Sequence, residues 1–304
     1  MAFCSKKNEL RRDDRGRILR EAVEYSVVDH CNLRCAGCDH AAPQLTRRFA
    51  DPEAFAADME ALSRHLHVRV LRLLGGEPLL HPALDAFVRK AQKAAIANQI
   101  MLWTNGLLLH KVPRELLQSF DIVRVSLYPH VHVQADLDDL ARDLAERSTR
   151  LEVVVINRFQ HQLLNDPIED LKLVRRTYLR CKDAHSLSCH TVYQGRYYKC
   201  AKAPVLEPRL AGCGIEVSNR DGDGVALHGN PSLGEDLARY LLSREPLIAC
   251  TWCLGTDGTS FCHHQLDETG IHMERRRGVT DEPILFAKPV RQFVRDMRDR
   301  VSTP

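Results

Sequence analysis

The chain has 304 residues, of which 44% are hydrophobic and 27% are charged, as in an ordinary soluble globular protein. Its formal net charge is only +3, from 43 basic and 40 acidic residues, which gives no reason to expect nucleic acid as a partner. No apolar stretch approaches the roughly 18 residues of a transmembrane helix, and no signal peptide opens the chain. We therefore expect a cytoplasmic protein with no membrane partner. In a reducing compartment its eleven cysteines are expected to bind metal or do chemistry rather than to form disulfides.

The first half of the chain alternates short apolar runs with amphipathic stretches. The runs predict buried parallel strands at residues 25–28, 68–74, 100–103, 122–127 and 151–156. Asp51-Pro52 predicts the start of one helix, Pro82 and Pro113 predict two more, and residues 137–144 have the spacing of a fourth. Repeated strand–helix units predict an α/β fold with a parallel sheet, open or curled toward a barrel. Such folds bind ligands at the carboxyl ends of their strands.

The pattern changes after about residue 180, where strands become short and Cys, Gly and His become more frequent. Residues 189–200 predict a hairpin that turns at Gln194-Gly195. A helix is predicted at about residues 232–243, and a terminal amphipathic helix is predicted from Val290, Phe293, Val294 and Met297. This half is predicted to form a small cysteine-rich appendage.

Three cysteines with the spacing CxxxCxxC follow the first predicted strand, namely Cys31, Cys35 and Cys38. Three thiolates on one loop can bind three corners of a [4Fe–4S] cube and leave one iron open to another molecule. A structural zinc site, completed by His30 or His40, is the alternative.

Glycine or polar residues end the other four predicted strands. The second strand ends in Gly75-Gly76-Glu77-Pro78, whose two glycines permit a tight turn that approaches a ligand closely. The later strands end in Thr104 and Asn105, in Ser126 and in Asn157. The alternative role for these polar residues is local capping of the strand end.

Together, the CxxxCxxC loop and the Gly-Gly-Glu-Pro turn resemble the radical S-adenosylmethionine (SAM) superfamily over roughly residues 22–160. The resemblance implies a partial (β/α)6-type barrel in which SAM binds the open iron and is cleaved to methionine and a 5′-deoxyadenosyl radical. It implies that residues 75–78 bind the amino group of SAM, and that the cluster is reduced by an external electron donor of the flavodoxin or ferredoxin type. Other SAM contacts are expected from Thr104, Asn105, Ser126 and Asn157. One residue departs from the family, because the position before the third cysteine is often aromatic there and is Gly37 here.

Four later cysteines form two separated pairs, Cys189 with Cys200 and Cys250 with Cys253. Such pairs suit either a tetrahedral zinc ion or a four-cysteine iron–sulfur cluster. Their order resembles the auxiliary-cluster appendage called SPASM or, in its shorter form, twitch, although the gap from Cys189 to Gly195 is shorter than usual. The resemblance implies a second [4Fe–4S] cluster. The predicted division is an N-terminal arm (1–21), a radical SAM core (22–180), an auxiliary-cluster region (181–275) and a C-terminal helix (276–304).

Cys4, Cys181, Cys213 and Cys262 remain after these assignments. They are inert thiols in the interior or, for Cys213 and Cys262, either spare ligands of the auxiliary cluster or candidate donors of a hydrogen atom to a substrate radical.

Enzymes of aminoglycoside pathways are among the family members with one such appendage, which implies a small carbohydrate-like substrate. The predicted reaction is hydrogen abstraction from a sugar or aminocyclitol carbon, followed by epimerisation through a donor cysteine. Two-electron dehydrogenation of an aminocyclitol or sugar alcohol is an alternative. Peptide modification is another, although the fewer than about 25 residues before the first strand are too few for a leader-peptide domain. The non-enzymatic alternative is a zinc-stabilised binding module.

Overall fold

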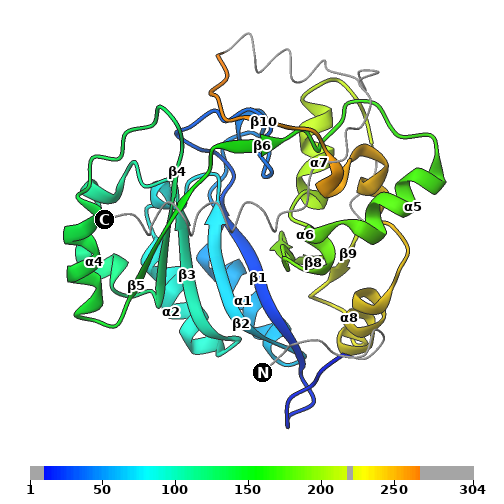
Figure 1. The fold of residues 1–304 in the computed structure, drawn as a ribbon. Coiled ribbons are helices and arrows are strands. Elements are labelled where there is room, and N and C mark those ends of the chain that lie inside the picture. Colours follow the sequence, from blue (N-terminus) through cyan, green and yellow to red (C-terminus); the bar gives the residue numbers. More distant parts are fainter. Residues whose placement is uncertain (1–9, 218–221, 268–304) are drawn as a thin grey trace, which may run out of the picture.

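The computed structural model describes residues 10–217 and 222–267, which form the fold in Figure 1. Cys4 and the predicted terminal helix lie outside these residues. The described part contains an eight-stranded sheet in the order β5-β4-β3-β2-β1-β7-β8-β9. Its strands are β1 (Ile18–Val28), β2 (Leu66–Gly75), β3 (Ala97–Thr104), β4 (Ile122–Leu127), β5 (Arg150–Val155), β7 (Thr191–Tyr193), β8 (Arg196–Tyr198) and β9 (Gly224–Ala226).

The predicted α/β class is confirmed, and β1 to β5 pair in parallel at the five predicted places. β1 starts at Ile18, earlier than the apolar run alone indicated. These five strands lie side by side in sequence order, whereas a (β/α)6 arrangement implies six such strands. A sixth parallel strand, β7, lies on the other side of β1. The sheet is thus mostly parallel and consistent with a partial barrel.

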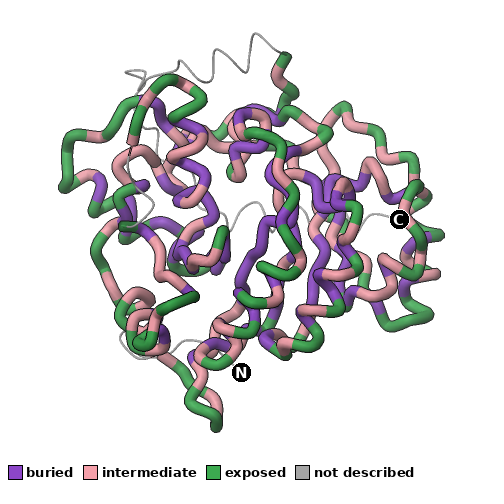
Figure 2. Tube along the Cα trace, turned by 180° about the vertical axis from the view of Figure 1, so that it is seen from behind, coloured by how far each residue is buried: buried purple, intermediate pink, exposed green. Residues whose placement is uncertain are grey.

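One face of the sheet is buried under α1 (Pro52–Ser63) and α2 (Leu84–Ala94), which lie behind it in Figure 1. Asp51 caps α1 as predicted, because its carboxylate accepts from the N–H groups of Glu53 and Ala54. Phe55 and Phe87 are fully buried in the main core, where each contributes about 1.5–3 kcal/mol of hydrophobic stabilisation. Figure 2 shows buried residues concentrated along the central strands.

The remaining helices lie at the two sides of the sheet. α3 (Arg114–Leu117) is a single turn, and α4 (Leu137–Ala145) packs beside β5. On the other side lie α5 (Leu171–Arg180), α6 (Lys182–His185), α7 (Ala203–Ala211) and α8 (Leu233–Leu242), which is the helix predicted near residue 232. Short 3-10 helices are η1 (Ala42–Gln44), η2 (Pro78–Leu80), η3 (Leu109–Lys111), η4 (Ile248–Trp252) and η5 (Gly255–Asp257). No helix in the described ranges is long and apolar enough to cross a membrane.

The predicted hairpin at Gln194-Gly195 is present, with both residues at positive φ as a two-residue turn requires. Its first strand, β7, pairs with β1, so the hairpin extends the sheet of the strand–helix units. Val192 and Tyr197 are fully buried in the same core as the helix-facing side of β1 and β2. The cysteine-rich appendage therefore shares its sheet and core with the first half of the chain.

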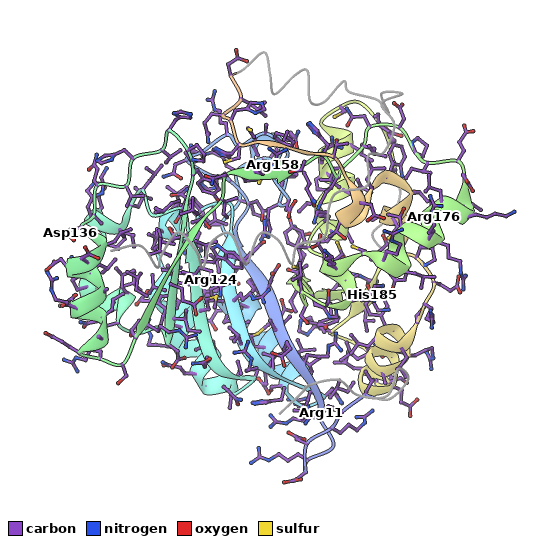
Figure 3. All side chains as sticks on the ribbon, viewed as in Figure 1. Arg11, Arg124, Asp136, Arg158, Arg176 and His185 are labelled. Carbon is purple, nitrogen blue, oxygen red and sulfur yellow. The ribbon has the colours of Figure 1, made fainter. Side chains whose placement is uncertain are left out.

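A second, two-stranded sheet lies across the carboxyl ends of the parallel strands. It pairs β6 (Arg158–Gln160) with β10 (Ser260–Cys262) in antiparallel orientation, at the top of the molecule where Figure 3 labels Arg158. The chain after β10 continues along the loop that follows β1. An isolated bridge joins Cys35 to Gln265, and the amides of Ala36 and Leu266 bond the carbonyls of His264 and Arg34 at 3.1 and 2.7 Å.

The ends of β1 and β2 are in direct backbone contact because of Gly75 and Gly76. A Cβ atom on Gly75 would lie 2.1 Å from the Val28 carbonyl oxygen, and one on Gly76 would lie 2.0 Å from that of His30. Gly76 N–H donates to the Val28 carbonyl at 2.7 Å, and Glu77 N–H donates to the His30 carbonyl at 3.0 Å. No residue other than glycine fits this approach, and Gly75 also has a φ of 145°.

The carboxylate of Glu77 is completely buried and joins the ends of β2 and β3. It accepts from Leu79 N–H (3.0 Å), from the Thr104 hydroxyl (2.6 Å) and from Asn105 N–H (2.8 Å). Burial raises the pKa of Glu77 to about 7, and these three donors oppose the rise by favouring the charged form.

The raised pKa of Glu77 predicts a specific pH dependence of stability. The folded protein holds the Glu77 proton up to pH 7, whereas the unfolded chain releases it near its ordinary pKa of 4.5, so this group lowers the free energy of unfolding as the pH rises between those values. The loss is about 3 kcal/mol, at roughly 1.4 kcal/mol per pKa unit. In Glu77→Gln this part of the pH dependence should disappear, as measured by urea denaturation at pH 5 and pH 8. Substitution of the exposed Glu60 by Gln is the control, and parallel pH profiles for Glu77→Gln and wild type would contradict the prediction.

Candidate functional site

The three cysteines of the CxxxCxxC motif lie on the loop after β1, against the turn that follows β2. Cys35 is buried, and Cys31 and Cys38 are half-buried. Burial raises the pKa of Cys31 and of Cys38 to about 12, and the charges of neighbouring thiolates add to the rise. In the absence of a bound metal these thiols are therefore protonated at neutral pH, whereas coordination to a metal deprotonates a thiol outright.

Hydrogen-bond donors surround two of these sulfur atoms. Leu33 N–H and the Asn105 side-chain amide lie 3.3 and 3.5 Å from the sulfur of Cys31. The side chains of His263 and Gln265 lie 3.2 and 3.4 Å from the sulfur of Cys35. Thiolates that bind an iron–sulfur cluster accept hydrogen bonds of this kind, so the surroundings of these sulfur atoms fit a cluster held by three cysteines.

The zinc alternative for this loop gains no support from the geometry. Over residues 10–217 and 222–267, no three Cys, His, Asp or Glu side chains converge as the ligands of a single metal ion do. The cysteines of a cubane bind different irons and need not converge on one point. His30, one of the two candidate zinc ligands, packs edge-on against Phe49 with ring centroids 4.9 Å apart.

The polar residues predicted at the strand ends occupy different surroundings. Thr104 and Asn105 are buried beside Glu77, and the Asn105 amide also donates to the Asn32 side chain at 2.7 Å, which joins the end of β3 to the cysteine loop. Ser126 is buried and accepts from Trp103 Nε1 at 2.8 Å. Asn157 is exposed, and its carbonyl accepts from His263 N–H at 2.9 Å.

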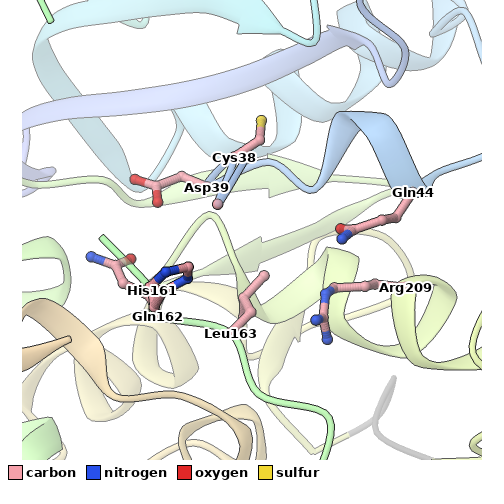
Figure 4. A pocket seen from close by; sticks show the side chains of 8 residues that line it. Cys38, Asp39, Gln44, His161, Gln162, Leu163 and Arg209 are labelled. Atoms are coloured by element: carbon pink, nitrogen blue, oxygen red, sulfur yellow. The ribbon is translucent and has the colours of Figure 1, made fainter. Parts of the chain in front are cut away.

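A small pocket, open to solvent, adjoins the cysteine loop (Figure 4). Figure 4 shows Cys38 and Asp39 on one side, residues 161–163 facing them, and Gln44 with Arg209 of α7 at one end. Arg209 donates to the carbonyl of Leu164 and to the side chain of Asn165. The carboxylate, amide and imidazole groups on these walls suit a polar ligand.

The space beside Gly37 is filled by an aromatic ring from β10. A Cβ atom on Gly37 would lie 2.8 Å from Phe261 Cζ, and Gly37 has a φ of 63°. Phe261 stacks on His161 with ring centroids 4.1 Å apart. The loop therefore carries no aromatic residue before Cys38, but an aromatic pair lies next to that position.

A second group of cysteines lines a small, mainly apolar cavity in the appendage. It contains three of the four predicted members of the auxiliary set, Cys200, Cys250 and Cys253, together with Cys181. Burial raises the pKa of Cys200 to about 12 and that of Cys253 to about 11, and the Lys202 ammonium opposes both shifts. Four thiols in one cavity form a donor set that fits a four-cysteine cluster.

Cys189, which the sequence assigned to this set, does not line the cavity. It precedes β7, and its thiol lies near the charges of Glu24 and Arg72 and also of Asp183 and Lys202, the ammonium group that acts on Cys200 and Cys253 as well. Cys181 ends α5, and η5 packs against it, since a Cβ atom on Gly255 would lie 3.5 Å from the Cys181 sulfur.

The two candidate hydrogen donors lie in different places. Cys262 is exposed on β10, and its sulfur accepts from Arg158 at 3.6 Å. Cys213 follows α7, and its thiol donates to the Arg209 carbonyl at 3.4 Å. Sequence reasoning missed His263, Gln265 and Phe261 as neighbours of the cysteine loop, because more than two hundred residues separate them from it and no local pattern marks the pairing.

Comparison with curated sequences finds enzymes named GTP 3′,8-cyclase. That of Chlorobaculum tepidum is 36% identical over 107 residues, which is 34% of this chain and 32% of the relative. That of Peptoclostridium acidaminophilum is 27% identical over 164 residues, 49% of each chain. The chain thus spans at most about half the length of these relatives.

Comparison with solved structures finds BtrN in complex with AdoMet and 2-DOIA, with a TM-score of 0.47 and 15% identity over 78% of this chain and 94% of that one. Streptococcus suis SuiB bound to S-adenosylmethionine gives a TM-score of 0.34 and 18% identity over 43% and 33% of the two chains. At these values neither likeness identifies a function.

The family comparison matches the model described as the Radical SAM superfamily to residues 25–156. The match spans β1 to β5, with the cysteine loop, the turn at Gly75-Gly76 and the end of β3 between them. The part of the chain that carries the three-cysteine loop and the strand ends gathered against it is therefore the part that matches the Radical SAM superfamily model.

Proposed function

We propose that the chain holds a [4Fe–4S] cluster on Cys31, Cys35 and Cys38, binds SAM beside it, and abstracts a hydrogen atom from a small substrate. The match of residues 25–156 to the superfamily model supports SAM and the catalytic cluster as cofactors. When bound, they supply a 5′-deoxyadenosyl radical. The observation that carries the proposal is the meeting of three strand ends at one loop, where Asn105 contacts both Cys31 and Asn32.

The residues of the chain would bind, orient and shield these groups. Leu33 and Asn105 would donate to the Cys31 thiolate, and the backbone of Gly75 and Gly76 would form the wall against which SAM lies. The Glu77 carboxylate is completely buried and is bonded to Thr104 and Asn105, so its role is to hold the ends of β2 and β3 together. The backbone carbonyls of its turn are therefore the better acceptors for the ammonium group of SAM. Strand-end positions are also where ligands bind in parallel α/β folds.

We propose a hydroxyl- and amine-rich, carbohydrate-like substrate in the cavity beside Cys38. Asp39, Gln44, His161 and Gln162 present donors and acceptors there. An external one-electron donor of the flavodoxin or ferredoxin type belongs to the same proposal.

Two outcomes remain for the substrate radical. The four-thiol cavity favours dehydrogenation, since a bound auxiliary cluster would supply an acceptor for the second electron as the substrate loses a proton. The exposed Cys262 on β10, next to the segment that pairs with the cysteine loop, favours epimerisation by return of a hydrogen atom.

The cluster proposal predicts a brown, oxygen-sensitive protein. Anaerobic purification should yield about eight iron and eight sulfide per chain, from two cubanes. Incubation with SAM and dithionite should release 5′-deoxyadenosine, and Cys35→Ser should abolish this release because one of three ligands is lost. Cys213→Ser is the control and should keep its iron. A colourless protein that contains zinc would contradict the proposal.

Because Cys181 lines the four-thiol cavity, we predict that Cys181, and not Cys189, is the fourth ligand of the auxiliary cluster. Cys181→Ser should lose the iron of the auxiliary site, about four per chain, whereas Cys189→Ser should keep the full content. Iron analysis and Mössbauer spectroscopy of the two variants measure this directly. Loss of this iron from Cys189→Ser but not from Cys181→Ser would instead assign Cys189 as the fourth ligand.

The reaction outcome is tested by replacing Cys262 and Cys213 by Ala and supplying aminocyclitol and aminoglycoside substrates. Dehydrogenation predicts a product that lacks two hydrogen atoms and full turnover in both variants. Epimerisation predicts a product of unchanged mass, and loss of product in one variant while 5′-deoxyadenosine still forms. Mass spectrometry separates the two results.

A further inference from the structure

The segment after β10 lies against the cysteine loop and reaches the sulfur of one particular cysteine. Residues 264–266 pair with residues 34–36 through the bridge of Cys35 with Gln265 and the flanking backbone bonds described above. This pairing brings the side chains of His263 and Gln265 to the sulfur of Cys35. The contact spans 228 residues of sequence.

His263 is held in a fixed orientation. Its backbone N–H donates to the Asn157 carbonyl at 2.9 Å, and its ring stacks on Tyr128 with centroids 4.7 Å apart. Phe159 of β6 packs against the same ring at 5.1 Å. The side chain is only 5% exposed, and its Nε2 lies 3.2 Å from the Cys35 sulfur. The stacked Tyr128 ring and the tilted Phe159 ring restrain the imidazole, so it presents this nitrogen to the sulfur without further ordering.

The orientation of the Gln265 amide is also determined by its contacts. Its Oε1 accepts from Arg34 N–H at 2.6 Å. Its Nε2 therefore points the other way, toward the Cys35 sulfur at 3.4 Å. Gln265 Nε2 also lies 3.3 Å from His263 Nε2. A thiolate is an acceptor only, so with the His263 proton on Nε2 both side chains would donate to it once a metal is bound.

The donors to Cys31 have a different origin. They are Leu33 of the same loop and Asn105 at the end of β3, both inside the stretch that matches the family model. The donors to Cys35 come from residues 263–265, beyond that stretch. The environment of Cys35 therefore depends on how the end of the appendage folds back.

We propose that His263 and Gln265 are positioning residues that donate hydrogen bonds to the Cys35 thiolate and raise the reduction potential of the catalytic cluster. The inference rests on the proposed function, since it presupposes a cluster on Cys31, Cys35 and Cys38. Reduction adds negative charge to the cluster and its thiolates, and donors at a ligand sulfur stabilise the more negative form. The end of the appendage thus sets how readily the cluster accepts an electron.

Two substitutions remove the donors and keep the other contacts. His263→Phe retains an aromatic ring to stack on Tyr128 and Phe159, and Gln265→Glu retains the oxygen that accepts from Arg34 N–H. His264→Ala is the matched control, because the His264 ring is exposed and its backbone carbonyl, which bonds Ala36, is unchanged.

The test is an EPR-monitored redox titration of the three anaerobically purified variants and wild type, with iron content measured alongside. At a fixed applied potential, the ratio of reduced to oxidised catalytic cluster should fall several-fold in His263→Phe and in Gln265→Glu, and stay at the wild-type value in His264→Ala. Equal ratios in all four proteins, at equal iron content, would overturn the inference and leave the proposed function intact. Loss of iron from both donor variants would assign these residues a structural role only, which also overturns it. Wild-type protein without iron would overturn the proposed function itself.

Discussion

The direct backbone contact between the ends of β1 and β2 is the constraint on which the site depends. Gly75 and Gly76 have no side chains, so their backbone reaches the carbonyl groups of Val28 and His30 and fixes the start of the cysteine loop. Any Cβ atom at these positions would push the loop away from the sheet edge. Beyond this contact, the Asn105 side chain at the end of β3 donates to the Cys31 sulfur.

A buried carboxylate completes this arrangement. Glu77 is removed from water entirely, which is unfavourable for its charged form, and three donors from the ends of β2 and β3 offset part of that penalty. Glu77 therefore links the ends of β2 and β3 through hydrogen bonds. Its position next to two glycines explains why the sequence Gly75-Gly76-Glu77 functions as a unit: the glycines permit the approach and the carboxylate holds it in place.

Most of the strand–helix pattern follows from local sequence, because a buried parallel strand is an apolar run and a helix cap is a local hydrogen bond. The five strands and the cap at Asp51 were predictable for that reason. Long-range pairing was not. Cys189 and Cys181 are both single cysteines near short elements, and only the pairing of β7 with β1 directs Cys189 toward Glu24 and leaves Cys181 in the cavity. His263 and Gln265 reach Cys35 through a bridge for which no spacing rule exists.

Through the same pairing of β7 with β1, the segments that carry the two groups of cysteines adjoin one continuous sheet. Lys202, almost completely buried, lies 2.6 Å from Asp183 and 3.5 Å from Asp39. Asp39 directly follows Cys38, and Asp183 lies two residues after Cys181, so a single ammonium group lies between the cysteine loop and the four-thiol cavity. Lys202 and Asp183 are both buried, so removing either one would leave the other with an uncompensated charge away from water. The Asp39 side chain is half exposed, so its longer contact with the same ammonium group contributes less.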